Sequence, residues 1–232
     1  MSLGLVLLLA LAAAIYFGLA HRILDRMRLT DVQALIFIAA MIAGGFVTIP
    51  IPVGQIGLSV NVGGALVPIA LSLYLLSKAD TTWEWVRALL AAVGTAATIW
   101  AIALATDFGP EAGRTVFIDS VWLYSLAGGV IAYLLGRSRR AAFIAGTFGV
   151  VLADLAHMVQ LWTRRLPGMV AMGGAGVFDT TVLAGLIAVT LAELIGESRE
   201  RIQGGPELGG DRPLALRQDE GVSEDDFRGE DL

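Results

Sequence analysis

Long apolar runs separated by short charged linkers restrict the fold of this sequence more than any other feature. A helix that crosses a hydrocarbon core of about 30 Å needs roughly 20 mostly apolar residues. Hydrophobic residues make up 56% of the chain and charged residues 16%, with a mean hydropathy of +0.74, which is typical of an integral membrane protein. We therefore predict an all-α polytopic membrane protein. Its seven expected spans are residues 3–20, 33–52, 56–77, 86–106, 121–136, 141–162 and 176–195.

The C-terminal part of the chain has a different composition. Residues 1–196 contain all the apolar runs, whereas residues 197–232 are polar, rich in glycine and acidic side chains, and punctuated by Pro206 and Pro213. Such a segment offers too little apolar surface to offset the entropy of ordering it. We predict one transmembrane helical domain followed by an acidic, mostly disordered cytoplasmic tail.

The basic residues predict the orientation. Cytoplasmic loops of membrane proteins carry an excess of Lys and Arg. If the N-terminus is outside and the tail is in the cytoplasm, most basic residues of the loops lie on the cytoplasmic side. Those residues are Arg22, Arg26, Arg28, Lys78, Arg87, Arg137, Arg139 and Arg140, against Arg114, Arg164 and Arg165 outside. The pair Arg164–Arg165 is the exception to the rule.

Two glycine-rich stretches interrupt the apolar runs before the expected third and seventh helices. Gly63 and Gly64 precede the short apolar run 65–77, and Gly173, Gly174 and Gly176 precede the last run. A glycine within a helix costs about 1 kcal/mol, so clustered glycines indicate broken or closely approached backbone. Because residues 56–64 carry no charge, we expect them to lie in the membrane as irregular backbone, which is tolerated only against protein or a polar cavity.

The two glycine-rich stretches also belong to a weak internal sequence repeat. Phe37-Ile38-Ala39 precedes Gly63-Gly64-Ala65 much as Phe143-Ile144-Ala145 precedes Gly173-Gly174-Ala175. The two units are about four spans apart, so both would run in the same direction. Parallel repeats of this kind occur in transporters, where paired interrupted helices mark the binding site.

Three motifs together resemble a known family. They are the segment from Ser59 to Pro68 with its Asn61-Val62-Gly63-Gly64-Ala65 core, the triplet Ala153-Asp154-Leu155, and the segment from Gly173 to Asp179. The chain from about His21 to Ile195 is similar to the prokaryotic integral membrane proteins called domain of unknown function 1614. This resemblance implies a multi-span protein of the prokaryotic inner membrane and no particular activity.

Four polar residues inside the apolar runs are the candidate site. Asp154 and Asp179 are expected at similar depth in the outer half of the membrane, and Asn61 approaches from the same side. His157 is three residues from Asp154, which predicts a shared helix face. Ionisable groups within a span indicate function. The predicted ligand- or ion-binding set is Asn61, Gly63, Gly64, Asp154, His157, Gly173, Gly174, Gly176 and Asp179.

Three interpretations of this set stay open. The first is a polar cavity that binds or passes an ion, a proton or a small solute. The second is a scaffold or partner subunit, in which Asp179 caps its helix and Asp154 pairs with His157 or Asn61. The third is an aspartyl intramembrane protease with Asp154 and Asp179 as catalytic residues. Those enzymes place aspartate directly after Gly-x-Gly, whereas Val177 and Phe178 intervene here.

Residue usage excludes several other classes. The chain has no cysteine and only two histidines, so we expect no disulfide, no thiolate nucleophile and no metal site. No basic stripe with interleaved aromatic residues suggests nucleic-acid binding, and no motif predicts a cofactor. The expected partners are the lipid bilayer and a small ion or solute, and assembly of several copies of the chain stays open.

Overall fold

The computed structural model describes residues 12, 13, 15, 21–54, 56–79, 81–106, 120–174, 176 and 179–202. The chain divides into two units, residues 1–195 and 196–232. Most of the expected first span (3–20), the loop 107–119 and most of the tail lie outside the described residues. The fold below is that of the first unit.

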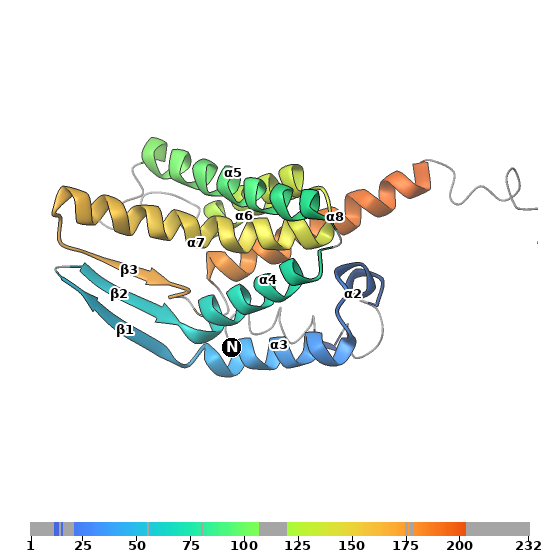
Figure 1. The fold of residues 1–232 in the computed structure, drawn as a ribbon, viewed down its shortest axis with the longest axis horizontal. Helices are drawn as coiled ribbons and strands as arrows, with labels where there is room; N and C mark the ends of the chain where they lie inside the picture. Colours follow the sequence, from blue (N-terminus) through green and yellow to red (C-terminus); the bar gives the residue numbers. More distant parts are fainter. Residues whose placement is uncertain are drawn as a thin grey trace, which may run out of the picture. The chain divides into compact units, whose positions relative to one another are not determined.

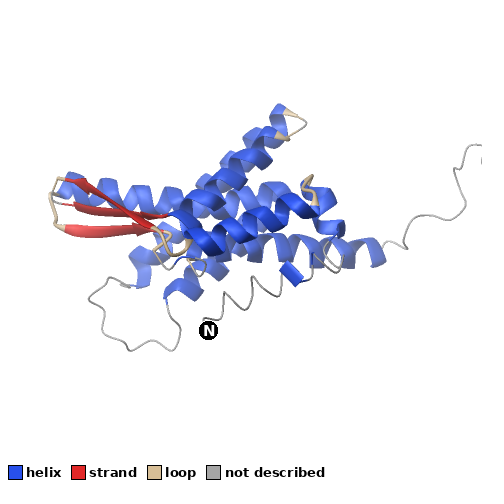
Figure 2. Ribbon diagram, turned by 90° about the horizontal axis from the view of Figure 1, so that it is seen from below, coloured by secondary structure: helices blue, strands red, loops and turns tan. Residues whose placement is uncertain are grey.

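The described residues are mostly helical, as predicted (Figure 1). The helices are α2 (His21–Met27), α3 (Asp31–Gly44), α4 (Val67–Ser77), α5 (Thr82–Thr106), α6 (Ser120–Gly136), α7 (Arg139–Arg164) and α8 (Thr180–Ile202). The strands are β1 (Thr48–Val53), β2 (Ile56–Asn61) and β3 (Gly168–Met172), and a π-helical turn, η1 (Val62–Leu66), joins β2 to α4. The all-α prediction is wrong in one respect, because the three strands form a sheet, which Figure 2 shows as a group at one end of the helices.

Helices α5, α6 and α7 pack together through small residues. A Cβ added to Gly149 of α7 would lie 2.5 Å from the side chain of Thr95 on α5. The helix axes can approach this closely only because glycine has no side chain there. Arg140 and Glu84, at the starts of α7 and α5, form an ion pair of 3.1 Å. The two long helices therefore begin at the same end and run in the same direction.

Helix α8 runs antiparallel to α7. Near the start of α7, Arg139 pairs with Glu193 near the end of the apolar part of α8. Further along, a Cβ added to Gly146 would lie 2.9 Å from the backbone of Ala184. From the first contact to the second, the position rises from 139 to 146 along α7 and falls from 193 to 184 along α8, as it does for an antiparallel pair of helices.

The sheet corrects the expected second and third spans. Helix α3 ends at Gly44 rather than near Pro52, and β2 replaces the irregular backbone expected after it. Strands β1 and β2 form an antiparallel hairpin, and β3 pairs with β2 in parallel, with Ile56 beside Gly168 and Val60 beside Met172. Branched residues with β propensity favour these strands, but the β2–β3 pairing joins segments more than a hundred residues apart.

Two prolines blunt the free edge of the sheet. The Val62 N–H donates to the Val47 carbonyl at 2.9 Å, so β1 residues of odd number point their backbone groups toward β2. Pro50 and Pro52 therefore stand where an N–H would point away from the sheet. Proline has no N–H, so this edge is poorly suited to pairing with a further strand.

The opposite part of the sheet packs against α7. Ile56, Val170 and Met172 form a buried cluster with Met158 and Leu161 of α7. The strands thus lie beside the second half of α7, while α4 and α8 lie beside its first half (Figure 1).

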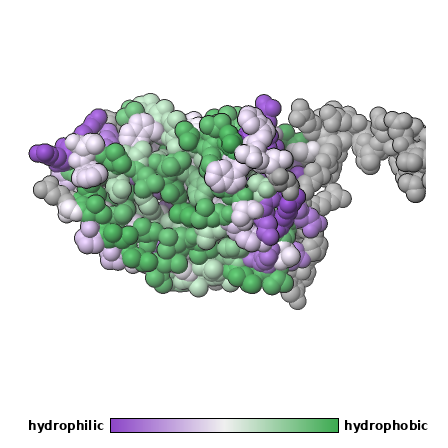
Figure 3. Space-filling view, viewed as in Figure 1, coloured by the Kyte–Doolittle hydropathy of each residue, from purple (hydrophilic) through white to green (hydrophobic). Residues whose placement is uncertain are grey.

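A broad apolar band separates two hydrophilic regions on the surface in Figure 3. Large apolar side chains that the protein leaves uncovered include Leu90, Leu126, Leu134 and Val159. By length and composition, two of the described helices can cross a membrane, Thr82–Ala105 and Arg139–Arg164. The segments Asp31–Gly44, Val62–Ser77, Val121–Gly136 and Thr180–Gly196 are apolar but shorter.

Candidate functional site

Three glycine-bearing segments meet backbone to backbone at the centre of the unit. We call this contact the glycine junction; its residues are Gly44, Gly63, Gly64, Gly173 and Gly176. A Cβ at Gly64 would collide with the carbonyl oxygens of Gly173 and Gly176, and one at Gly63 with the backbone of Met41 and Gly45. Gly173 and Gly176 also have φ of +67° and +62°, which side chains disfavour. Gly174 is exposed and contacts Ala171 instead.

Asn61 is the residue that ties the junction together. Its side chain is only 2% exposed. The Nδ2 group donates to the Gly45 carbonyl at 2.9 Å and to Thr48 Oγ1 at 3.0 Å, while Oδ1 accepts from the Gly64 N–H at 2.8 Å. Both donors are thus engaged within the protein. Asn61 caps η1 and holds α3, β1 and η1 together; the ligand role expected of it stays a prediction.

Asp179 is the N-cap of α8. Its Oδ1 accepts from the Thr181 N–H at 2.9 Å and from Thr181 Oγ1 at 2.7 Å. Capping of this kind satisfies a backbone donor that has no partner within the helix. The side chain is half-buried and lies just before Thr180, the first residue of α8.

Asp154 interrupts an apolar face of α7. Val150, one turn before it, packs with Ile99 and Ala184, and Met158, one turn after it, packs beneath the sheet. Its half-buried carboxylate lies within range of a Coulomb interaction with Asp179. The antiparallel arrangement of α7 and α8 explains this, because Asp154 lies eight residues after Gly146 on α7 and Asp179 lies five residues before Ala184, the residue that Gly146 contacts.

His157 is not brought into the site. Its side chain is exposed, whereas Asp154 is half-buried. Residues three apart on a helix differ by about 60° in direction, and the boundary between covered and uncovered surface on α7 falls between these two. The spacing correctly indicated neighbouring positions, but it could not show where that boundary lies.

Two buried hydroxyls were not singled out by the sequence. Thr147 Oγ1 and Ser72 Oγ are inaccessible and have no hydrogen-bond partner among the described residues. Thr147 lies seven residues before Asp154, so the two share a face of α7. It also contacts α8, since a Cβ added to Gly185 would be 2.9 Å from Thr147 Oγ1. The signal that could have found it is this heptad spacing from an intramembrane aspartate.

The chemistry open to this site is that of two neighbouring carboxylates. Carboxylates bind protons and cations through their oxygens. Within the part of the chain that the structure describes, no group of three or more His, Cys, Asp or Glu residues could hold a metal ion.

Comparison with known proteins agrees with the resemblance noted from the motifs. A family model described as "Protein of unknown function (DUF1614)" matches residues 22–191. The match includes the glycine junction and both aspartates. Searches of curated proteins and of solved structures give no match.

Proposed function

Because the chain belongs to the DUF1614 family of proteins of unknown function, we propose a function from its geometry alone. The protein is a multi-pass membrane protein that binds and passes a proton or a small cation at Asp154 and Asp179. One observation carries this proposal. The carboxylate of Asp154 on α7 lies within range of a Coulomb interaction with that of Asp179 at the start of α8, and the residues one turn before and after Asp154 pack in apolar clusters.

The distribution of charge along α7 supports the membrane placement. This helix of 26 residues is about 39 Å long at 1.5 Å per residue. Arg139 and Arg140 lie at one end and Arg164 at the other, so the apolar stretch between them matches the hydrocarbon core. Asp154 then lies at membrane depth, in the half nearer Arg164.

Seven passes follow if three of them combine a strand with a helix. The passes are the N-terminal run 3–20, α3 with β1, β2 with α4, α5, α6, α7, and β3 with α8. Strands of five or six residues add roughly 17–20 Å to each short helix. Arg28, Lys78, Arg87 and Arg137 lie at the end of the bundle marked by Arg139 and Arg140. This end is placed in the cytoplasm of a prokaryotic cell, with the N-terminus outside.

The order of the elements supports a transport role. A strand, a glycine turn and a helix follow one another in 56–77 and again in 168–195, and the two strands are parallel neighbours. The two glycine turns touch at the junction. Paired interrupted segments of this kind form the ion and substrate sites of secondary transporters.

The electrostatics suit a proton or a cation. Two carboxylates in surroundings of low dielectric constant cannot both carry charge cheaply. A proton or a cation bound between them removes this cost, and its release restores it. Transport needs a site that can alternate between these two states.

The capping geometry of Asp179 favours a second candidate, a scaffold without transport. The variant Asp179→Asn distinguishes the scaffold from the transporter, because asparagine caps a helix about as well as aspartate but has no charge with which to bind a proton or a cation. A scaffold therefore tolerates Asp179→Asn and is damaged by Asp179→Ala. A transporter loses flux with either change. The protease alternative uses the same pair and predicts cleavage of co-reconstituted membrane segments.

The test is flux into proteoliposomes that contain the purified full-length chain, with pH-sensitive and cation-sensitive dyes inside. Asp154→Asn and Asp179→Asn should each abolish flux while the amount of folded protein is unchanged. Asp25→Asn, in the exposed surface of α2, is the matched control and should retain flux. Absence of flux in the wild-type protein, or equal flux in all variants, would overturn the proposal.

A further inference from the structure

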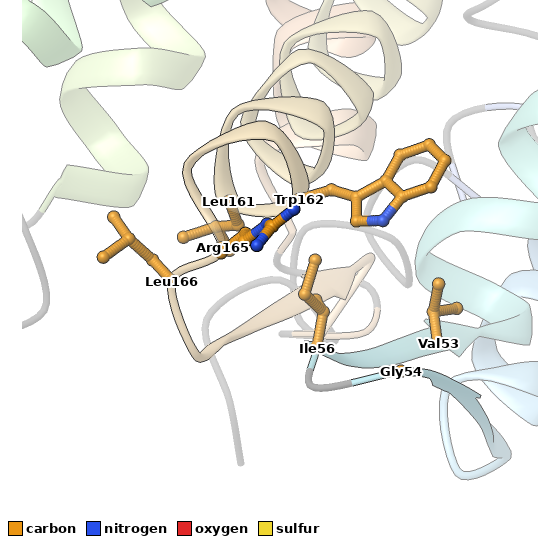
Figure 4. A pocket seen from close by; sticks show the side chains of 7 residues that line it. All are labelled: Val53, Gly54, Ile56, Leu161, Trp162, Arg165 and Leu166. Atoms are coloured by element: carbon orange, nitrogen blue, oxygen red, sulfur yellow. The ribbon is translucent and has the colours of Figure 1, made fainter.

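A cavity lies where the C-terminal end of α7 meets the tip of the β1–β2 hairpin (Figure 4). Its volume is about 440 Å³, within the range of about 300–1,000 Å³ found for small-molecule sites. The side chains that form it are Val53, Ile56, Leu161, Trp162, Arg165 and Leu166. The walls are thus apolar, with one indole and one guanidinium at the margin. None of these residues belongs to the carboxylate pair.

Arg165 is available to an anion. It follows the last residue of α7 with φ of 53°, which places it in the left-handed conformation that ends the helix. Its side chain is exposed. Among the described residues, ion pairs join Arg139 to Glu193 and Arg140 to Glu84, and none engages Arg165.

An exposed apolar stripe on α7 leads away from the cavity, and we call this stripe, together with the β1 side chains described below, the trough. Leu155, Val159 and Trp162 follow one another at helical spacing and are 38%, 48% and 71% exposed. In Figure 4 the Trp162 ring points toward Val53, so this stripe borders the β1 side of the helix. A long apolar chain would be covered along one side by this stripe.

Strand β1 supplies the facing side of the trough. Ile49, Ile51 and Val53 are opposite Val60, Leu58 and Ile56 of β2. Directly opposed residues project from the same face of a sheet, and these β2 residues pack toward α7. The three β1 side chains therefore face the same way but remain about two-fifths exposed, at 43%, 40% and 36%.

We propose that this cavity and trough bind a phospholipid, with its phosphate on Arg165 and an acyl chain between the α7 stripe and β1. The guanidinium matches a phosphate in charge and in hydrogen-bond geometry. Trp162 beside it suits the level of the glycerol backbone, where indole rings concentrate in membrane proteins. A bound lipid phosphate also accounts for a basic residue at the outer end of the helix bundle, where the positive-inside rule expects few.

A lipid fits better than a free phosphate ion because the cavity offers only one cation and mostly apolar wall. A small anion would gain little from a single exposed guanidinium in water. An acyl chain against the stripe and β1 adds van der Waals contacts that a free phosphate cannot make. The proposal depends on the membrane placement and is independent of the carboxylate pair.

The test measures the thermal stability of the purified full-length chain in a neutral detergent during titration with phosphatidylglycerol. Diacylglycerol with the same acyl chains and inorganic phosphate serve as separate titrants. We expect phosphatidylglycerol to raise the melting temperature in a saturable manner and the other two to leave it nearly unchanged. Arg165→Gln should weaken the apparent affinity roughly tenfold, as expected for a lost hydrogen bond to a charged group.

Two matched controls make the test specific. Arg164→Gln removes the neighbouring charge, which does not line the cavity, and should leave the affinity within about twofold. Trp162→Ala should weaken binding, whereas Trp83→Ala, an exposed tryptophan in the first turn of α5, should not. The proposal is wrong if Arg165→Gln binds as tightly as the wild-type protein, or if inorganic phosphate alone reproduces the stabilisation.

Discussion

The carboxylate of Asp154 on α7 interacts electrostatically with that of Asp179, the residue that caps α8. The two are neighbours because α7 and α8 run antiparallel from the Arg139–Glu193 ion pair through the contact of Gly146 with Ala184. Substituting Gly146, or either aspartate, therefore tests a single geometric arrangement.

Gly64→Ala should strongly destabilise the protein. The new Cβ would collide with two carbonyl oxygens of the opposite glycine turn, which are backbone atoms and cannot rotate away. Overpacking typically costs about 1–3 kcal/mol, and this site should lie at the upper end of that range. Thermal unfolding in detergent measures the effect. Gly57→Ala is the control, because its Cβ would meet Met169 at an ordinary 3.6 Å; equal melting temperatures for the two variants would contradict the junction.

Asp179→Ala should lower stability by about 1 kcal/mol, because the cap of α8 is lost, whereas Asp179→Asn should cost much less. For a chain of this size, 1 kcal/mol corresponds to a fall of about 2–4 °C in melting temperature. Thermal unfolding in detergent compares the two variants with the wild-type protein. Equal loss in both would mean that the charge of Asp179, and not its cap, stabilises the fold.

Asn61→Ala should be among the most destabilising side-chain truncations. It removes a hydrogen-bond partner from the Gly45 carbonyl, from Thr48 Oγ1 and from the Gly64 N–H. A buried group left without a partner costs about 1–3 kcal/mol. Thr48→Val removes only one of these bonds and is the graded control. A smaller effect for Asn61→Ala than for Thr48→Val would show that water replaces the amide.

Thr147→Val should leave stability unchanged or raise it by about 1 kcal/mol. The exchange keeps the side-chain shape and removes a buried hydroxyl that has no partner. Thr95→Val is the matched control, since Thr95 is equally buried but donates to the Ala91 carbonyl at 2.9 Å. If Thr147→Val instead destabilises the protein or reduces flux, then water reaches this hydroxyl and connects it with Asp154.

Single-cysteine labelling should establish the orientation directly, because the chain contains no cysteine. Thr82→Cys and Arg164→Cys introduce exposed thiols at opposite ends of the bundle. In intact cells, a membrane-impermeant maleimide should label the second variant and not the first. Disrupting the membrane should make both reactive. Labelling of Thr82→Cys in intact cells would reverse the proposed orientation.

The sequence by itself determined the helices whose evidence is local. Apolar runs of about 20 residues define α5 and α7, and glycine pairs mark the end of α3 and the turn before α4. The expectation that glycine clusters bring backbone segments together also needs only the absence of a Cβ. The resemblance to DUF1614 also rests on contiguous motifs, and the family model confirms it.

The tertiary structure alone decided the features that depend on distant partners. Strand β3 exists because β2 pairs with it, and no local periodicity of five residues specifies that pairing. The role of Asn61 depends on which carbonyl and hydroxyl groups surround it, and the exposure of His157 on which side of α7 its neighbours cover. Asp154 was visible as an unusual residue in an apolar run. Its neighbour Asp179 follows from the register of two antiparallel helices, which is set by close packing of Gly146 against Ala184 and is not encoded in the spacing of either aspartate.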